Sequence, residues 1–289
     1  MTIYNLYNQL IMNVRNQNGQ MSRKSYYPSK VAHFESIPYA NIESSGRRFR
    51  PAKELSSIDL NPKTPPTQRN THPSSPAWDA SLQTPACIQA PKLSEADIEQ
   101  SEDCLYLSVF MPHTTDINPR KDQSRDELYD VIVYFHGGAY GRGSKENIDG
   151  ARLSLDQNFI VVSVSFRLGP FGFWVYVDKA IGNEGYDEVG NWALQDQKLA
   201  LKFIYENIGS FGGNRNKITL MGCGSGGQAI AHHLLHSESN KYFHNAVLLS
   251  STLGLPIDSN NNYFQYGAIT SSLECCPNGL VGDILGWVN

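Results

Sequence analysis

Several features that define large classes of protein are missing from this sequence. It contains no apolar run of about 18 residues or more, so no membrane span is expected. The formal net charge is only −4 across 289 residues, with no long block of like charge, which argues against a nucleic-acid-binding surface. Residues 1–7 include no basic stretch followed by an apolar one, so no signal peptide is visible.

Metal and cofactor motifs are missing as well. The sequence has no Cys-x-x-Cys pair, and no pair of histidines four residues apart has further plausible ligands beside it. We therefore expect neither a metal site nor a cofactor. Asn-x-Ser/Thr sites are also missing, so glycosylation gives no indication of the compartment.

The sequence does contain enough apolar residues, 40% of the total, to bury a sizeable core. Residues 1–30 are polar and aromatic without periodicity, and we expect a poorly ordered lead-in there. The rest, residues 31–289, is expected to form one domain. Within it, residues 51–91 combine many prolines with polar residues, which is typical of a long surface loop.

Alternating strands and helices indicate an α/β architecture with a mostly parallel sheet. Nearly continuous apolar and β-branched residues predict buried strands at residues 105–111, 131–136, 160–166, 218–221 and 246–250. Helical periodicity predicts a helix over residues 192–207 with one apolar face. A second helix is predicted to begin after Gly227. His232, His233 and His236 lie on or beside it, and we expect them to be packed or solvated helix residues.

The most informative segment is the glycine-rich run at residues 222–227, directly after a predicted strand. A strand, a sharp glycine-rich turn and a helix form the G-x-S-x-G nucleophile elbow of α/β-hydrolases. Here the frame reads G-C-G-S-G, which places Gly224, without a side chain, where the attacking serine would stand. Two alternatives stay open. Ser225 could be a nucleophile displaced by one position, or Cys223 a thiol nucleophile, although this would place Met221 where a small residue is needed.

Further motifs make the resemblance specific. Residues 136–140, H-G-G-A-Y, follow an apolar strand, as the glycine loop does in lipases and esterases. Residues 101–107 match the S-E-D-C-L-Y-L signature of type B carboxylesterases and cholinesterases, and other matching blocks follow the family's order at residues 34–40, 166–169, 190–197 and 207–214. The chain resembles the N-terminal half of a type B carboxylesterase domain. Glycine at position 224 resembles the neuroligins and related non-catalytic, cholinesterase-like adhesion proteins.

This resemblance implies an α/β-hydrolase fold whose sheet is incomplete at the C-terminus, with an open apolar edge. It also implies that the backbone N–H groups of Gly138, Ala139 and Ser225 correspond to the three oxyanion-hole donors. An alanine is acceptable at position 139 provided that its φ is negative.

Two structural links are implied as well. Cys87 and Cys104 fall on the family's disulfide pair, so their Cα atoms are expected about 4.4–6.8 Å apart. Arg48 and Glu102 correspond to an ion pair that we expect to be buried.

The stretch after Gly224 is too short to reach the family's catalytic acid and histidine, so we expect no complete triad in this chain. The first hypothesis is a non-catalytic, carboxylesterase-like scaffold that binds a protein partner at an extracellular or cell surface. The second is a carboxylic ester hydrolase, of which the chain is a fragment or which uses Ser225. The third is a truncated product that does not fold stably alone. The pairing of Cys275 and Cys276 is left open.

Overall fold

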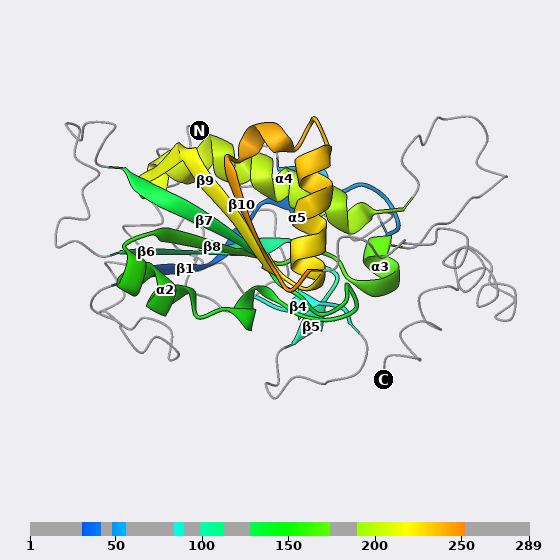
Figure 1. Ribbon diagram of the computed structural model, residues 1–289. Helices are drawn as coiled ribbons and strands as arrows, with labels where there is room; N and C mark the ends of the chain where they lie inside the picture. Colours follow the sequence, from blue (N-terminus) through cyan, green and yellow to red (C-terminus); the bar gives the residue numbers. More distant parts are fainter. Residues whose placement is uncertain are drawn as a thin grey trace, which may run out of the picture.

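The computed structural model describes residues 31–41, 48–55, 84–89, 99–112, 128–173 and 190–251 (Figure 1). The predicted lead-in, most of the proline-rich stretch, and Cys275 and Cys276 lie outside the described residues. No helix in the described ranges is long and apolar enough to cross a membrane. Within the same ranges, no group of three or more side chains could hold a metal ion.

The elements follow one another in this order: β1 (Val31–Pro38), β2 (Ala40–Asn41), β3 (Lys53–Glu54), β4 (Ala86–Cys87), β5 (Gln100–Ser101), β6 (Tyr106–Pro112), β7 (Tyr129–Phe135), the short helix η2 (Lys145–Asn147), α2 (Gly150–Gln157), β8 (Ile160–Val164), α3 (Gly169–Phe173), α4 (Trp192–Asn207), η3 (Ile208–Phe211), β9 (Gly213–Cys223), α5 (Ser225–Leu235), η4 (Asn240–Tyr242) and β10 (Asn245–Leu249).

A six-stranded sheet in the order β1-β6-β8-β7-β9-β10 forms the centre of the molecule. Strands β8, β7, β9 and β10 are parallel, whereas β6 runs antiparallel to both of its neighbours. Strands β6 and β8 are buried along their whole length, because their nearly continuous apolar residues are covered on both faces. The predicted α/β class with a mostly parallel sheet is confirmed.

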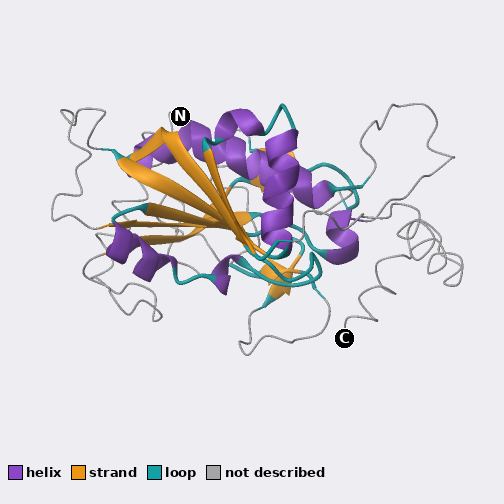
Figure 2. Cartoon of the chain, viewed as in Figure 1, coloured by secondary structure: helices purple, strands orange, loops and turns teal. Residues whose placement is uncertain are grey.

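Helices cover both faces of this sheet (Figure 2). On one face, Ala151 of α2 packs in a small apolar cluster with Phe110 and Val161. Helices α4 and α5 lie on the other face, over the main core, to which the neighbouring residue Val162 belongs. Successive side chains of a strand point to opposite faces, which is why Val161 and Val162 contribute to different clusters.

The first helix on the main core, α4, has the bounds that its periodicity predicts, Trp192–Asn207. Its apolar face, including Ala193, Ala200, Leu201 and Ile204, is buried.

The start of α5 differs from the prediction. The sequence places the helix start after Gly227, but α5 begins at Ser225 and includes Gly226 and Gly227. Both glycines belong to the first turn of the helix, where it packs closely on other segments of the chain. A Cβ on Gly226 would lie 2.2 Å from the carbonyl oxygen of Phe135, and a Cβ on Gly227 would lie 2.8 Å from the Cβ of Ser251.

Strand β10 is one of the two outer strands of the described sheet, and no described strand pairs with its far edge. Val247 and Leu249 on β10 are 41% and 45% exposed. Leu234 and Leu235 at the end of α5 are 44% and 88% exposed. Within the described ranges, all exposed large apolar side chains therefore belong to β10 or α5.

Candidate functional site

The candidate site is the turn that joins β9 to α5. Gly224 is the only residue between the last residue of the strand, Cys223, and the first residue of the helix, Ser225. Its φ of 58° and ψ of −120° form a strained backbone that favours glycine. The turn is held in place because the Gly224 N–H donates to the Leu249 carbonyl at 2.9 Å and the Gln228 N–H donates to the Gly224 carbonyl at 3.0 Å. A Cβ at Gly224 would meet no atom within 4 Å, so the apex of the turn faces open space.

Glycines allow three chain segments to meet at this turn. A Cβ on Gly222 would lie 2.6 Å from the carbonyl carbon of Gly226, so a side chain there would separate β9 from α5. A Cβ on Gly137 would lie 2.6 Å from the carbonyl oxygen of Cys223. The glycine loop after β7 therefore packs directly on the end of β9, as the sequence motifs predict for a hydrolase-like site.

The glycine loop adopts an unusual backbone conformation. Gly138, Ala139 and Tyr140 have consecutive positive φ values of 115°, 53° and 59°. Ala139 therefore does not meet the condition of a negative φ under which an alanine was acceptable at this position. The loop is a compact turn in which the Gly138 carbonyl accepts from both the Gly141 and the Arg142 N–H groups, at 3.1 and 3.2 Å, and the two residues between Gly138 and Gly141 are left-handed.

The residues assigned as oxyanion-hole donors come from two segments that contact each other. The Tyr140 N–H donates to the Ser225 hydroxyl oxygen at 3.3 Å, which links the glycine loop to the first turn of α5. The backbone N–H groups of Gly138, Ala139 and Ser225 donate no hydrogen bond to any described residue. Three backbone donors are thus available beside the turn.

His136 fixes the base of the glycine loop. Its ring stacks on Phe166, with a centroid distance of 4.3 Å and an interplanar angle of 2°, and its Nδ1 lies 2.8 Å from the Gly137 carbonyl. An Nδ1–H tautomer donates this hydrogen bond. Burial lowers the pKa of His136 to about 4, so the ring is neutral near pH 7. A Cβ on Gly143 would lie 2.3 Å from Nδ1, so the loop closes tightly over this ring.

His232 and His233 lie on α5, and His236 directly follows it. His233 is buried, with its Nε2 2.9 Å from Oε1 of Gln197 on α4. Burial, reinforced by the nearby His232, His236 and Lys198, lowers the pKa of His233 to about 3. The side chains of His232 and His236 are exposed.

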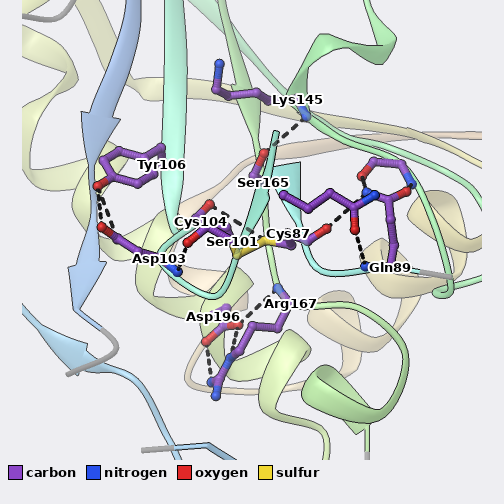
Figure 3. The surroundings of a disulfide bond; sticks show 12 residues. Cys87, Gln89, Ser101, Asp103, Cys104, Tyr106, Lys145, Ser165, Arg167 and Asp196 are labelled. Carbon is purple, nitrogen blue, oxygen red and sulfur yellow. Dashed lines mark hydrogen bonds and ion pairs between the residues drawn. A yellow bond between two sulfur atoms is a disulfide. The ribbon is translucent and has the colours of Figure 1, made fainter. Parts of the chain in front are cut away.

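A predicted disulfide joins the end of β4 to the segment just before β6 (Figure 3). Cys87 and Cys104 are bonded, and their Cα atoms are 4.9 Å apart, which confirms the prediction. Both residues line a small pocket, which is also lined by Arg48, Phe49, Ile88, Glu102, Arg167, Leu168 and Phe171.

The burial predicted for one ion pair is wrong. Arg48 and Glu102 do pair, with Nε 2.7 Å from Oε1, but their side chains are 36% and 26% exposed. The buried ion pair is Arg167–Asp196, whose side chains are 5% and 0% exposed and whose Nη2 and Oδ1 lie 2.6 Å apart (Figure 3). Arg167 also donates to the Arg50 carbonyl at 2.8 Å. Both partners lie in the matching motif blocks at residues 166–169 and 190–197, so the sequence does carry a signal for this pair.

Comparisons with known proteins agree with this geometry. A model of the carboxylesterase family matches residues 13–288. The neuroligin-like protein glit-1 of Caenorhabditis elegans is 34% identical over 220 residues, which are 76% of this chain and 27% of that protein. Esterase E4 of Myzus persicae is 31% identical over 254 residues, 88% of this chain and 41% of that protein.

A solved structure of a thermophilic PNB esterase superposes with a TM-score of 0.71 at 27% identity, covering 90% of this chain and 50% of that one. The chain therefore spans about half of the solved esterase, and 27% and 41% of the two curated relatives.

Proposed function

Because the chain belongs to the carboxylesterase family, we propose that its domain is a non-catalytic scaffold that binds a protein partner and hydrolyses no ester. In this proposal Gly224 occupies the nucleophile position. Gly138, Ala139 and Ser225 correspond to the oxyanion donors of active members.

The observation that carries the proposal is the conformation of Gly224. The nucleophile of this fold stands on the strained strand-to-helix turn, and the only residue between β9 and α5 is Gly224, with φ 58° and ψ −120°. A Cβ at Gly224 would meet nothing within 4 Å, so there is room for a side chain that glycine does not have. Ser225 is the first residue of the helix, and its hydroxyl already accepts from the Tyr140 N–H.

The surroundings of the turn also favour a non-catalytic role. A serine hydroxyl needs a base that accepts its proton. His136 and His233 are buried neighbours of this region, and burial lowers their pKa values to about 4 and about 3, which makes both weak bases. No described histidine hydrogen bonds to Ser225.

An extracellular or cell-surface location is part of the proposal. The Cys87–Cys104 disulfide supports it, because such bonds persist mainly in oxidising compartments. The likeness to a neuroligin-like protein supports a binding role, whereas the likeness to proteins named as esterases supports the alternative, carboxylic ester hydrolysis.

An activity test separates the scaffold from a hydrolase that uses Ser225. The chain, displayed on yeast, is assayed with a short-chain aryl ester and with a serine-directed fluorescent organophosphonate, beside displayed Esterase E4 as the positive control. We expect neither turnover nor labelling. The Gly224→Ser variant is also expected to stay inactive, because a hydroxyl at the apex lacks a base among the described residues.

Two outcomes would overturn the proposal. Turnover by the unmodified chain would place it among the hydrolases. Labelling that disappears in the Ser225→Ala variant would identify Ser225 as the displaced nucleophile. The matched control is Ser210→Ala, because Ser210 lies in η3, before the first residue of β9 and so at the opposite end of that strand from Gly224, and it is partly exposed like Ser225.

A further inference from the structure

A tyrosine–cation patch, made of Tyr205, Arg215, Lys241 and Tyr242, lies on the surface far from the turn at Gly224. The two tyrosine rings contact each other, with centroids 5.6 Å apart. The guanidinium of Arg215 lies 5.5 Å from the Tyr205 ring centroid, and the ammonium of Lys241 lies 5.1 Å from that of Tyr242. The patch thus presents two adjacent aromatic rings, each associated with one cation.

Three elements build the patch and hold it rigidly. Tyr205 comes from the last turns of α4, Arg215 from the beginning of β9, and Lys241 and Tyr242 from η4. Figure 1 shows η4 beside α4. Both tyrosines are partly buried and pack against the main core, whereas Arg215 and Lys241 are exposed. Aromatic side chains anchored in this way lose little conformational entropy when a partner binds.

The two cations of the patch are not ion-paired within the described part of the chain, although Lys241 lies near Glu238 and, after Lys198 and His236, contributes to the lowered pKa of that carboxylate. The other lysines of this region already have acidic partners: Lys198 pairs with Glu238 at 2.7 Å, Lys202 with Glu54 at 2.6 Å, and Lys217 with Asp130 at 3.4 Å. Arg215 and Lys241 form no ion pair within the described ranges. One further carboxylate, Glu206, is exposed here, and its charge contributes, after Glu54, to the raised pKa of Lys202.

The patch lies at the opposite end of β9 from the candidate site. Arg215 is near the first residue of the strand, and Gly224 follows its last residue. At a rise of about 3.3 Å per residue, the two positions are separated by roughly 25–30 Å. A partner on the patch therefore need not contact the turn.

We propose that the tyrosine–cation patch binds an acidic peptide segment of a protein partner. Carboxylates of that segment pair with Arg215 and Lys241, and an apolar side chain between them covers the two tyrosine rings. Tyrosine and arginine are the residue types that dominate binding energy at protein interfaces, and a guanidinium binds a carboxylate through two parallel hydrogen bonds. This inference rests on the proposed binding role and assigns a surface to it.

The test measures peptide binding to the full chain displayed on yeast, where tethered molecules do not self-associate. The probe is a biotinylated peptide in which Glu and Asp residues surround a central Trp. We expect saturable binding that weakens as salt is raised. The Arg215→Ala, Lys241→Ala double variant is expected to bind at least about tenfold more weakly, since it removes both charge-assisted contacts.

A matched variant controls for net charge. Arg50→Ala with Arg152→Ala also removes two positive charges, and both side chains are exposed outside the patch, Arg152 in a surface ion pair with Asp156. It is expected to bind within about twofold of the unmodified chain, because exposed pairs contribute little to the fold.

Three results would overturn the inference: no binding of the peptide, equal loss in both double variants, or equally tight binding of a single-stranded DNA oligonucleotide. The first two would show that the patch has no specific role, and the third that it attracts anions in general. Ester turnover would refute the proposed function without changing this titration, so the two failures are distinguishable.

Discussion

Replacing Gly226 with alanine tests how closely α5 approaches the sheet beneath the candidate site. The added Cβ would lie 2.2 Å from the carbonyl oxygen of Phe135, 2.7 Å from that of His136 and 2.9 Å from the carbonyl carbon of Phe135. All three atoms belong to the backbone at the end of β7. They cannot rotate away as a flexible side chain can, so α5 must move off the sheet.

The magnitude follows from two opposing effects. Overpacking a well-packed core costs about 1–3 kcal/mol, and a clash with backbone belongs at the upper end, about 3 kcal/mol. Alanine is favoured over glycine in a helix by up to about 1 kcal/mol, which offsets part of that cost. The free energy of unfolding is therefore expected to fall by about 2 kcal/mol.

The matched control is Gly209→Ala. A Cβ at Gly209 would meet nothing within 4 Å, and its φ is not positive. Its stability is expected to stay unchanged or to rise by up to about 1 kcal/mol, because alanine reduces the entropy of the unfolded chain. Urea unfolding of both variants, each made in a chain kept monomeric by Val247→Lys and Leu249→Lys and followed by circular dichroism, would measure the difference. If Gly226→Ala were as stable as Gly209→Ala within about 0.5 kcal/mol, the close packing of α5 on β7 would be refuted.

The remaining predictions concern the open edge and acid sensitivity. The purified chain is expected to self-associate through the exposed apolar side chains of β10. The double variant Val247→Lys, Leu249→Lys should be monomeric in sedimentation velocity, because charged side chains block pairing at a strand edge. An unmodified chain that is monomeric and shows a sharp two-state urea transition would contradict this. In the monomeric double variant, His233 makes the stability depend on pH. Its pKa is 6.5 in the unfolded chain and about 3 in the folded one, so the stability that it contributes is present above pH 6.5 and is lost as the pH falls toward 3. Between pH 6.5 and 5 the loss is about 2 kcal/mol, and His233→Gln should remove it from the urea-derived stability profile; an unchanged profile would show that His233 is not buried as a neutral ring.

Local sequence signals predicted the elements that depend on neighbouring residues. The bounds of α4 agree with the prediction because its apolar side chains repeat with the helical period over many residues. Helix α2 was not predicted, since its buried face consists of Gly150, Ala151 and Ser154, which carry no strong apolar signal. Its position depends on contact with Phe110 of β6, where a Cβ on Gly150 would lie 2.3 Å from the ring.

At the candidate site, the sequence predicted which segments meet but not their detailed conformation. The glycine motifs placed the loop at residues 136–140 beside the turn at Gly224. The left-handed conformation of Ala139 was not predictable, because a positive φ is uncommon for alanine and no local residue pattern favours it. The start of α5 at Ser225 was missed because a glycine's role in close packing depends on atoms distant in the chain.

The sequence by itself determined the α/β class, the carboxylesterase-like motifs, the Cys87–Cys104 pair and the lack of a side chain at position 224. The class, the motifs and the missing side chain are carried by residue identity and spacing, whereas the cysteine pairing was implied by the resemblance that those motifs establish. Only the tertiary structure decided which ion pair is buried, Arg167–Asp196 rather than Arg48–Glu102, and that Tyr205 and Tyr242 share one surface with two cations. Burial and juxtaposition depend on how segments far apart in the chain pack together, and no local pattern encodes that arrangement.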